Sequence, residues 1–152
     1  MKRYWLMKSE PDCFSLMDLK NSPNQTAHWD GVRNYQARNF MKEMSIGDLV
    51  FFYHSNTKIP GIVGLMTVVK KAYPDFTALD PESEHPCAKS TIDNPRWFMV
   101  DVKYNQTFET IIPLEVLKKH EALKDLALVK KGNRLSIIPV SKKEWDFIMT
   151  LS

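Results

Sequence analysis

The chain has 152 residues, 43% of them hydrophobic and 26% charged, which is ordinary for one soluble globular domain and excludes a disordered or collagen-like chain. No stretch approaches the roughly 20 apolar residues of a membrane-spanning helix, and the N-terminal apolar run is too short for the core of a signal peptide. We therefore expect a single domain over residues 1–152 in an intracellular protein without membrane contact, cytoplasmic if bacterial and nuclear if eukaryotic.

Charge and cysteine content limit the possible partners. The 21 basic and 18 acidic residues give a net charge of +3 and a pI near 8.8. That permits a polyanionic partner but is below the value of about 9 that identifies a nucleic-acid-binding domain by itself. Cys13 and Cys87 are too few for a disulfide framework, and no ligand residues have the spacing of a zinc site. We expect free thiols, no metal, no cofactor and a monomer.

Apolar and alternating segments predict the strands. They are rich in aromatic and β-branched residues, which suit a pleated, half-buried surface. The predicted strands are 4–7, 49–53, 62–69, 97–104 and 135–138. Alternation within 97–104 predicts a core face formed by Phe98, Val100, Val102 and Tyr104. Residues 21–26 have the composition of a loop, and 73–94, with three prolines, is expected to be a short strand and a surface loop.

Capping residues predict where the helices begin. A capping side chain satisfies one of the free N–H groups of a first helical turn. The cap residues are Ser15 with Asp18, Asn34, and Ser141 with Glu144. After Asn34, apolar positions three and four residues apart predict a helix to Met44, and the last helix is expected to run to Leu151. Two further short helices are expected at 113–119 and 122–128.

The order of these elements predicts an α+β fold. Strands that follow one another closely along the chain tend to pair as antiparallel neighbours. The repeated βαβ units of a doubly wound sheet are absent from the sequence. We therefore expect four to six strands in a mainly antiparallel sheet, curled into a small barrel, with helices inserted between the strands.

Sharp enzyme motifs are absent from the sequence. The glycines build neither a phosphate-binding loop nor a dinucleotide-binding fingerprint, and no serine lies in a nucleophile elbow. No histidine begins an H-x-E or H-E-x-x-H motif. Glu10 and Asp12 could act as paired carboxylates, but a solvated loop after the first strand is the favoured interpretation. The residues therefore point to a protein that is not an enzyme.

The segment 28–40 is the most unusual part of the sequence. It places Trp29 and Arg33 next to a helix start at Asn34. A helix N-terminus offers free N–H groups to an anion, arginine pairs with phosphate, and tryptophan stacks on a base. The competing interpretation is a core Trp29 and a surface ion pair at Arg33. Composition alone favours the second interpretation, because tryptophan is usually well buried.

Polar residues also follow the predicted strands, where the mouth of a barrel would lie. Lys8 and Ser9 close the first strand, and Ser55 and Asn56 follow the second. Asparagine offers both a donor and an acceptor, as the edge of a base requires. Serine and asparagine are also common turn residues, and for each one taken singly the turn is the favoured interpretation. The residues around Arg134 have the same status.

Blocks along nearly the whole chain resemble the EVE domain family. The longest are 4–11 (YWLMKSEP), 29–39 (WDGVRNYQARN) and 47–56 (GDLVFFYHSN), with shorter matches at 72–75, 94–98, 134–136 and 139–141. The resemblance implies an α+β, PUA-like fold, a small bent β-barrel of mainly antiparallel strands with helices packed around it, related to the RNA-binding PUA and YTH domains. It also implies a non-catalytic reader of a modified base, notably 5-methylcytosine or 5-hydroxymethylcytosine in DNA.

The resemblance also implies a set of base-binding residues. They are Lys8, Ser9, Trp29, Gly31, Val32, Arg33, Asn34, Ser55, Asn56 and Arg134. We assign their roles from chemistry: an indole platform, a serine and asparagine that read the base edge, and cations for the flanking phosphates. With the resemblance added, a functional segment from Trp29 to Asn34 becomes the favoured interpretation. Residues 81–93 match the family poorly.

Three alternatives to a reader of modified DNA stay open. The first is an RNA-binding module like the PUA and YTH domains. The second is an enzyme acting on a nucleotide or modified base, with Glu10, Asp12 or His54 as acid–base groups. The third is an interaction module that uses its barrel edge for protein partners. No motif in the sequence supports the second or the third.

Overall fold

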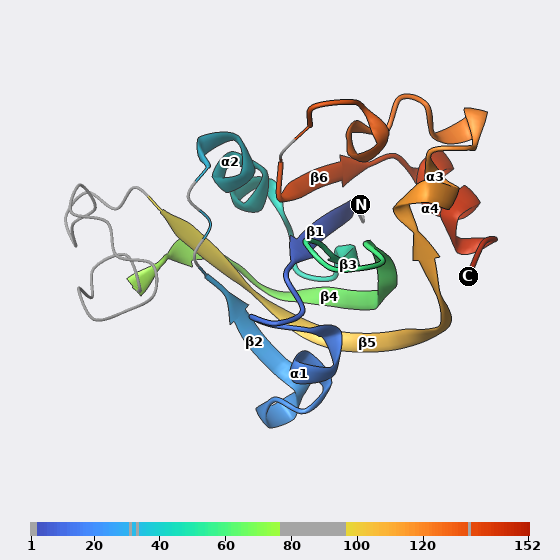
Figure 1. Ribbon diagram of the computed structural model, residues 1–152. Helices are drawn as coiled ribbons and strands as arrows, with labels where there is room; N and C mark the ends of the chain where they lie inside the picture. The colour runs from blue at the N-terminus through green and yellow to red at the C-terminus, as the bar shows by residue number, and fades with distance from the viewer. Residues whose placement is uncertain (1–2, 31, 33, 77–96, 134) are drawn as a thin grey trace.

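A six-stranded sheet surrounded by four α-helices makes up the described part of the chain (Figure 1). The computed structural model describes residues 3–30, 32, 34–76, 97–133 and 135–152. The strands are β1 (Tyr4–Ser9), β2 (Thr26–Trp29), β3 (Leu49–His54), β4 (Gly61–Pro74), β5 (Phe98–Pro113) and β6 (Ile137–Val140). The helices are α1 (Leu16–Lys20), α2 (Tyr35–Glu43), α3 (Leu114–Leu117) and α4 (Lys142–Met149), with 3-10 turns at Pro23–Gln25, Glu121–Leu123 and Ala127–Val129.

The strands form one mixed sheet in the order β2-β5-β4-β3-β1-β6. Four of its five pairings are antiparallel, as the sequence predicts, while β1 and β3 run parallel. The α+β class is therefore confirmed. Closure of the sheet into a barrel stays a prediction, because the pairings between the described strands leave β2 and β6 as the two edges.

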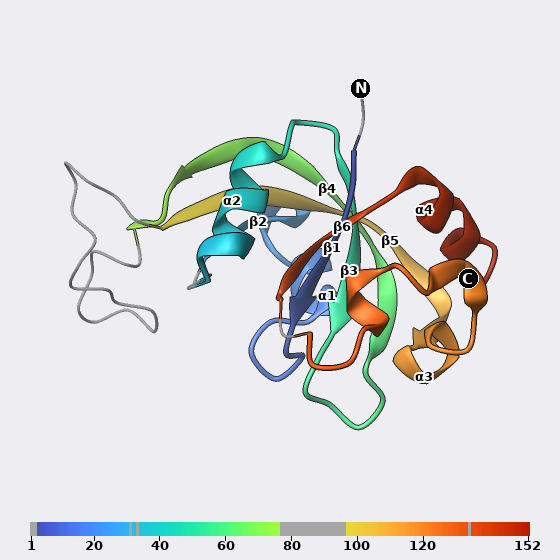
Figure 2. The ribbon, with the colours of Figure 1, turned by 90° about the horizontal axis from the view of Figure 1, so that it is seen from above.

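The longest strands, β4 and β5, form a bent hairpin that extends away from the rest of the sheet (Figure 2). Their pairing shifts register at several β-bulges, which bend a ribbon and increase its twist. Gly64 lies within this hairpin, where a Cβ would collide with the backbone oxygen of Gln106 and with the side chain of Leu16. The missing side chain at Gly64 therefore lets α1 pack directly against the sheet.

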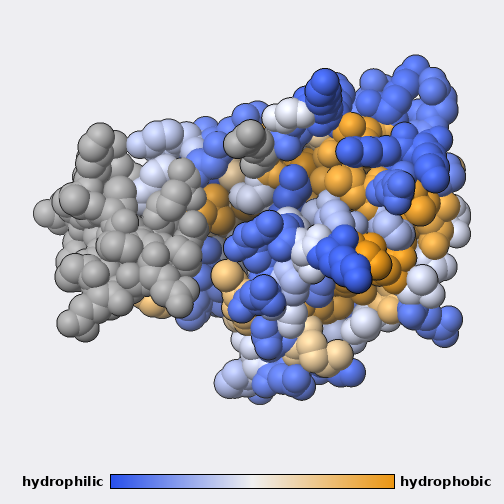
Figure 3. Space-filling model, viewed as in Figure 1, coloured by the Kyte–Doolittle hydropathy of each residue, from blue (hydrophilic) through white to orange (hydrophobic). Residues whose placement is uncertain are grey.

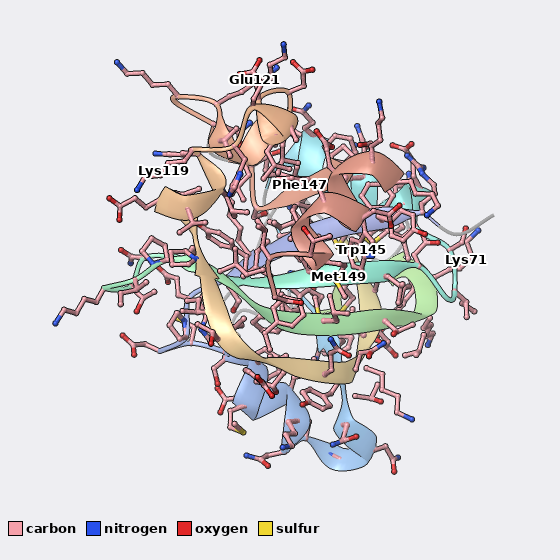
Figure 4. The ribbon with its side chains drawn as sticks, turned by 90° about the vertical axis from the view of Figure 1, so that its right-hand side faces the viewer. Lys71, Lys119, Glu121, Trp145, Phe147 and Met149 are labelled. Carbon is pink, nitrogen blue, oxygen red and sulfur yellow. The ribbon has the colours of Figure 1, made fainter. Side chains whose placement is uncertain are left out.

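Two core clusters lie on the two faces of the central strands. Trp5 and Met7 of β1 point into the first cluster, under α1 and α2, whereas Leu6 points into the second, under α3 and α4. In the second cluster Trp145 stacks on Phe51, with ring centroids 3.8 Å apart. Figure 4 shows Trp145 on α4, together with Phe147 and Met149. The central strands are thus buried on both faces.

The outer surface is mainly polar on the face seen in Figure 3, with apolar side chains gathered over β6 and α4. Phe147 and Leu135 are partly buried and pack against the second cluster. Within the described residues, no helix is both long and apolar enough to cross a membrane.

Local capping signals predicted the helix starts correctly. Ser15 and Ser141 both form the expected capping boxes, and Asn34 accepts a hydrogen bond from the Ala37 N–H at 2.9 Å. The predicted strands 4–7, 49–53 and 62–69 lie inside observed strands. In β5 the predicted core face is confirmed for Val100, Val102 and Tyr104, which all join the first core cluster. Phe98 is only partly buried and is not a member of this cluster, and Met99 on the opposite face is buried too, so the strand does not alternate cleanly at its start.

One strand was not predicted, and one expected helix was wrong. Strand β2 was not predicted, since its four residues follow a loop-like segment and are held by pairing with the distant β5. The helix expected at 122–128 is replaced by two 3-10 turns. Leu126 and Leu128 both point into the second core cluster. Residues two apart lie on opposite sides of an α-helix, so one helix could not bury both. Much of the loop expected at 73–94 lies outside the described residues.

Asp48 joins the N-terminal strand to the start of β3. Its side chain is buried, and its Oδ1 accepts from the Arg3 N–H at 3.1 Å. Its Oδ2 accepts from the Trp5 indole N–H at 3.0 Å and from the Ser45 N–H at 2.9 Å. This one carboxylate satisfies three donors from two separate segments, so its removal leaves each of them to find another acceptor.

We therefore expect Asp48→Ala to lower the free energy of unfolding by about 2–3 kcal/mol, because a buried donor without an acceptor costs about 1–3 kcal/mol. Urea denaturation measures the change. Glu43→Ala is the matched control: its ion pair with Arg3 is half-exposed and is worth about 0–1 kcal/mol. Equal losses in the two variants would contradict the role assigned to Asp48.

Candidate nucleic-acid interface

The parallel pairing of β1 and β3 brings four predicted site residues to one end of the two strands. Lys8 lies opposite Tyr53, and Ser9 lies opposite His54. One residue further on, the Ser55 N–H donates to the Ser9 carbonyl at 3.0 Å. If β1 and β3 were antiparallel, their C-terminal ends would lie at opposite ends of the pair. We call Lys8, Ser9, Ser55 and Asn56 the polar rim.

Two side-chain hydrogen bonds fix the polar rim to the segment that follows β1. The Ser9 hydroxyl donates to the Phe14 carbonyl at 2.6 Å, and Asn56 Nδ2 donates to Glu10 Oε1 at 2.6 Å. Asn56 has a φ of 50°, in the left-handed region that asparagine tolerates better than most residues. The two chain segments that end in the polar rim are therefore bonded to each other through both backbone and side chains.

Lys8 is the cation of the polar rim. Its Nζ lies 5.8 Å from the centroid of the Tyr53 ring, and partial burial lowers the pKa of its ammonium group. The Lys8 N–H donates to the Ser136 carbonyl at 2.8 Å, which brings the chain before β6 alongside. Arg134, two residues before Ser136, lies outside the described residues. Burial raises the pKa of Tyr53 to about 12, so its phenol stays neutral under ordinary conditions.

Trp29 is the last residue of β2 and lies in the first core cluster. Only 7% of it is exposed, and its ring packs edge-on against Phe14 at 6.3 Å and Phe52 at 5.4 Å. Val32 is buried in the same core cluster. A base could therefore reach the indole only over a small part of its surface. The buried Trp29 favoured by composition is confirmed, whereas its role as a stacking platform stays a prediction.

Asn34 is the N-terminal cap of α2. It is exposed, and its side-chain oxygen accepts from the Ala37 N–H at the start of α2. The sequence predicted this cap, and a contact between Asn34 and a base stays a prediction. Gly31 and Arg33, on either side of Val32, lie outside the described residues.

Aromatic and cationic side chains line the outer side of α2, which the sequence analysis did not single out. Tyr35 is 49% exposed and stacks on Trp97 with ring centroids 4.7 Å apart. The Arg38 guanidinium lies 4.8 Å from the Tyr35 centroid, and Lys42 Nζ lies 4.7 Å from that of Phe98. Spacings of three and four residues put Tyr35, Arg38 and Lys42 on one helix face.

Among the described residues, no three His, Cys, Asp or Glu side chains gather closely enough to hold a metal ion. Tyr73 and Asp101 form the clearest polar pair outside the polar rim: the Tyr73 hydroxyl donates to Asp101 Oδ1 at 2.6 Å. Burial and this hydrogen bond raise the pKa of Tyr73. The pair lies on the other face of β4 and β5 from α2, away from the polar rim.

Comparison with known proteins identifies the family of the chain. The family model described as the EVE domain matches residues 3–151. The chain belongs to the EVE domain family. Thymocyte nuclear protein 1 of zebrafish (Danio rerio) is 48% identical over 164 residues, which cover 97% of this chain and 71% of the relative.

Two solved structures with bound nucleic acid resemble this EVE domain in fold. Human THYN1, crystallised in complex with 5-methylcytosine-containing DNA, is 46% identical, with a TM-score of 0.95, and the match covers 99% of this chain and 97% of that chain. The YTH domain of Zygosaccharomyces rouxii MRB1 is 12% identical with a TM-score of 0.56, covering 99% of this chain and 86% of that chain. The second likeness shows a PUA- and YTH-like fold and no more.

Burial of Trp29 predicts a large effect on stability. We expect Trp29→Ala to lower the free energy of unfolding by about 3–5 kcal/mol, because it opens a cavity between Phe14 and Phe52. Chemical denaturation measures this loss, and a binding titration on the folded fraction measures any direct contact with a base. His28→Ala, at an exposed neighbour in β2, is the control. A stable Trp29→Ala variant that has lost binding would instead identify a stacking platform.

Proposed function

We propose that this EVE domain is a non-catalytic module that binds DNA and holds one modified base, 5-methylcytosine or 5-hydroxymethylcytosine, at the polar rim. The observation that carries the proposal is the likeness to human THYN1, 46% identical over nearly the whole chain and crystallised with 5-methylcytosine-containing DNA. We also propose that the strongly bent sheet closes as a PUA-like barrel, as the resemblance implies.

The chemistry of the polar rim supports this proposal. A base buried in a duplex must be flipped out, or met in a single strand, before a protein can inspect it. Ser55 and Asn56 offer a hydroxyl and an amide to the edge of such a base, and Lys8 offers a cation to a neighbouring phosphate. The parallel β1–β3 pairing brings the chain segments that carry these residues side by side.

The hydrogen bonds of the candidate acid–base groups support a non-catalytic role. Glu10 accepts from the Asn56 amide, and His54 Nε2 accepts from the Leu16 N–H at 3.2 Å. Asp12 is exposed. Two of the three candidates therefore serve the local structure. Recovery of a methylated oligonucleotide unchanged after incubation tests this directly, and conversion of the base would overturn it.

Selectivity among cytosines tests the base-reading proposal. A buried methyl group is worth about 0.8 kcal/mol and a neutral hydrogen bond about 0.5–1.5 kcal/mol. We therefore expect binding to rank hydroxymethylcytosine, methylcytosine and cytosine in that order, with gaps of several-fold. Competition titrations with three otherwise identical oligonucleotides, as DNA and as RNA, measure the ranking. Equal affinities would leave a general nucleic-acid binder, and stronger RNA binding would favour the RNA-binding alternative.

A pair of variants assigns that selectivity to Asn56. Asn56→Ala should compress the ranking, because it removes an amide that meets the base. Glu10→Ala is the matched control, since it breaks the same Asn56–Glu10 hydrogen bond and leaves the amide in place. The same compression in both variants would mean that Asn56 acts through the order of the polar rim and not on the base.

The salt dependence of binding tests the phosphate contacts. With about three to five such contacts, the slope of log affinity against log salt should be roughly −2 to −5. Lys8→Gln should reduce its magnitude by about 1, because it removes one phosphate contact. Lys119→Gln, at an exposed lysine beyond α3 (Figure 4), should leave the slope unchanged. A flat response in the unsubstituted protein would rule out backbone contacts.

A further inference from the structure

We infer that His54 is the positioning residue of the polar rim, and that protonation of its ring releases the segment 10–16 and weakens binding of the modified base at mildly acidic pH. The part of this inference that concerns binding rests on the proposed function. The part that concerns the segment 10–16 is a property of the protein alone.

His54, the last residue of β3, is bonded to Leu16, the first residue of α1. Its Nε2 accepts the Leu16 N–H at 3.2 Å, and its ring packs edge-on against Phe52 at 5.5 Å. Only an unprotonated ring nitrogen can accept a hydrogen bond, so the proton of this neutral ring is assigned to Nδ1. The Leu16 N–H is one of the free donors of a helix start, and a side chain from another strand satisfies it.

The segment between β1 and α1 is held at both ends, by Asn56 just after β3 and by His54, the last residue of β3. Near its start, Glu10 accepts from Asn56, and near its end Leu16 donates to His54. Between them, the Phe14 carbonyl accepts the Ser9 hydroxyl. The two ends of the polar rim therefore depend on this segment, and the hydrogen bond to His54 fixes its α1 end.

Protonation of Nε2 turns this acceptor into a donor. An N–H would then face the N–H of Leu16, and the hydrogen bond would be lost. The surroundings of the ring favour its neutral form. Burial lowers the pKa of His54, and the negative charge of Asp18 raises it by a smaller amount. The Asp18 carboxylate is held by the Ser15 N–H at 2.8 Å in the capping box, which keeps it on α1.

Few other charges face the ring from its neighbouring strands. Across the β3–β4 pairing His54 meets Gly61, which has no side chain. The end of β1 supplies Lys8 and Glu10, of opposite charge, and Glu10 is bonded to Asn56. With a pKa below its ordinary value of about 6.5, His54 is neutral at pH 7 and takes up its proton only as the pH falls further. The polar rim is therefore intact at neutral pH and is released in acid.

Affinity measured between pH 7.5 and pH 5.5 tests the inference, with a methylcytosine oligonucleotide and fluorescence anisotropy. We expect binding to the unsubstituted protein to weaken by roughly fivefold or more, at the lower end of typical couplings between two events. His54→Gln keeps an acceptor of similar reach and does not titrate, so it should show little further loss in acid. His28→Gln, at an exposed histidine, should follow the unsubstituted protein. A fall in His54→Gln equal to that in His28→Gln would overturn the inference.

Amide hydrogen exchange without DNA tests the structural step by itself. Protection of the Leu16 and Ser55 amides, corrected for the intrinsic rate, should fall as the His54 ring titrates. The Gly47 amide, which donates to Val68 far from the ring, should stay protected. Unchanged protection at Leu16 would overturn the inference even if affinity falls. If the protein binds no modified oligonucleotide but Leu16 opens with His54 protonation, the proposed function fails while the role of His54 in holding the segment stands.

Discussion

The parallel pairing of β1 and β3 is the constraint on which the rest of the structure depends. It is the one parallel pairing among the described strands, and it puts the C-terminal ends of β1 and β3 side by side. Backbone groups there bond to each other, and side chains complete the junction. A crossover from β1 to β3 needs a long connection, which here contains α1, β2 and α2. The same connection contains Trp29, which packs against Phe52 of β3, and Asn34, which caps α2.

In the candidate interface, polar side chains that we propose for recognition also serve the structure. Asn34 caps a helix, Ser9 holds a carbonyl, and Asn56 bonds a carboxylate. Each bond restricts a polar side chain before any ligand arrives. A binding group whose position is fixed in advance loses less conformational entropy on binding. Recognition of a substituent as small as a methyl group depends on this kind of order, since the energy at stake is only about 0.8 kcal/mol.

Sequence predicted what is local and missed what is distant. Capping boxes and alternation depend on residues a few positions apart, so Ser15, Ser141 and the core face of β5 could be identified. Strand β2 exists through its pairing with β5, over 70 residues away by number, and has no strong signal of its own. The residue types of the polar rim were predicted from the resemblance. Their bonds were not, because the partners Glu10 and Phe14 come from a segment whose path depends on the whole sheet.

The central strands have one further consequence, for the way the molecule unfolds. Alternate residues of β1 and β3 enter opposite core clusters, so neither cluster can come apart while the other keeps its strands intact. Helices α3 and α4 cover one face, and α1 and α2 the other, yet both layers share the same two strands. Independent subunits of stability need separate sets of contacts, which this arrangement does not provide. The domain should thus unfold as one cooperative unit, so that a destabilising substitution next to Trp145 also destabilises the core cluster on the opposite face.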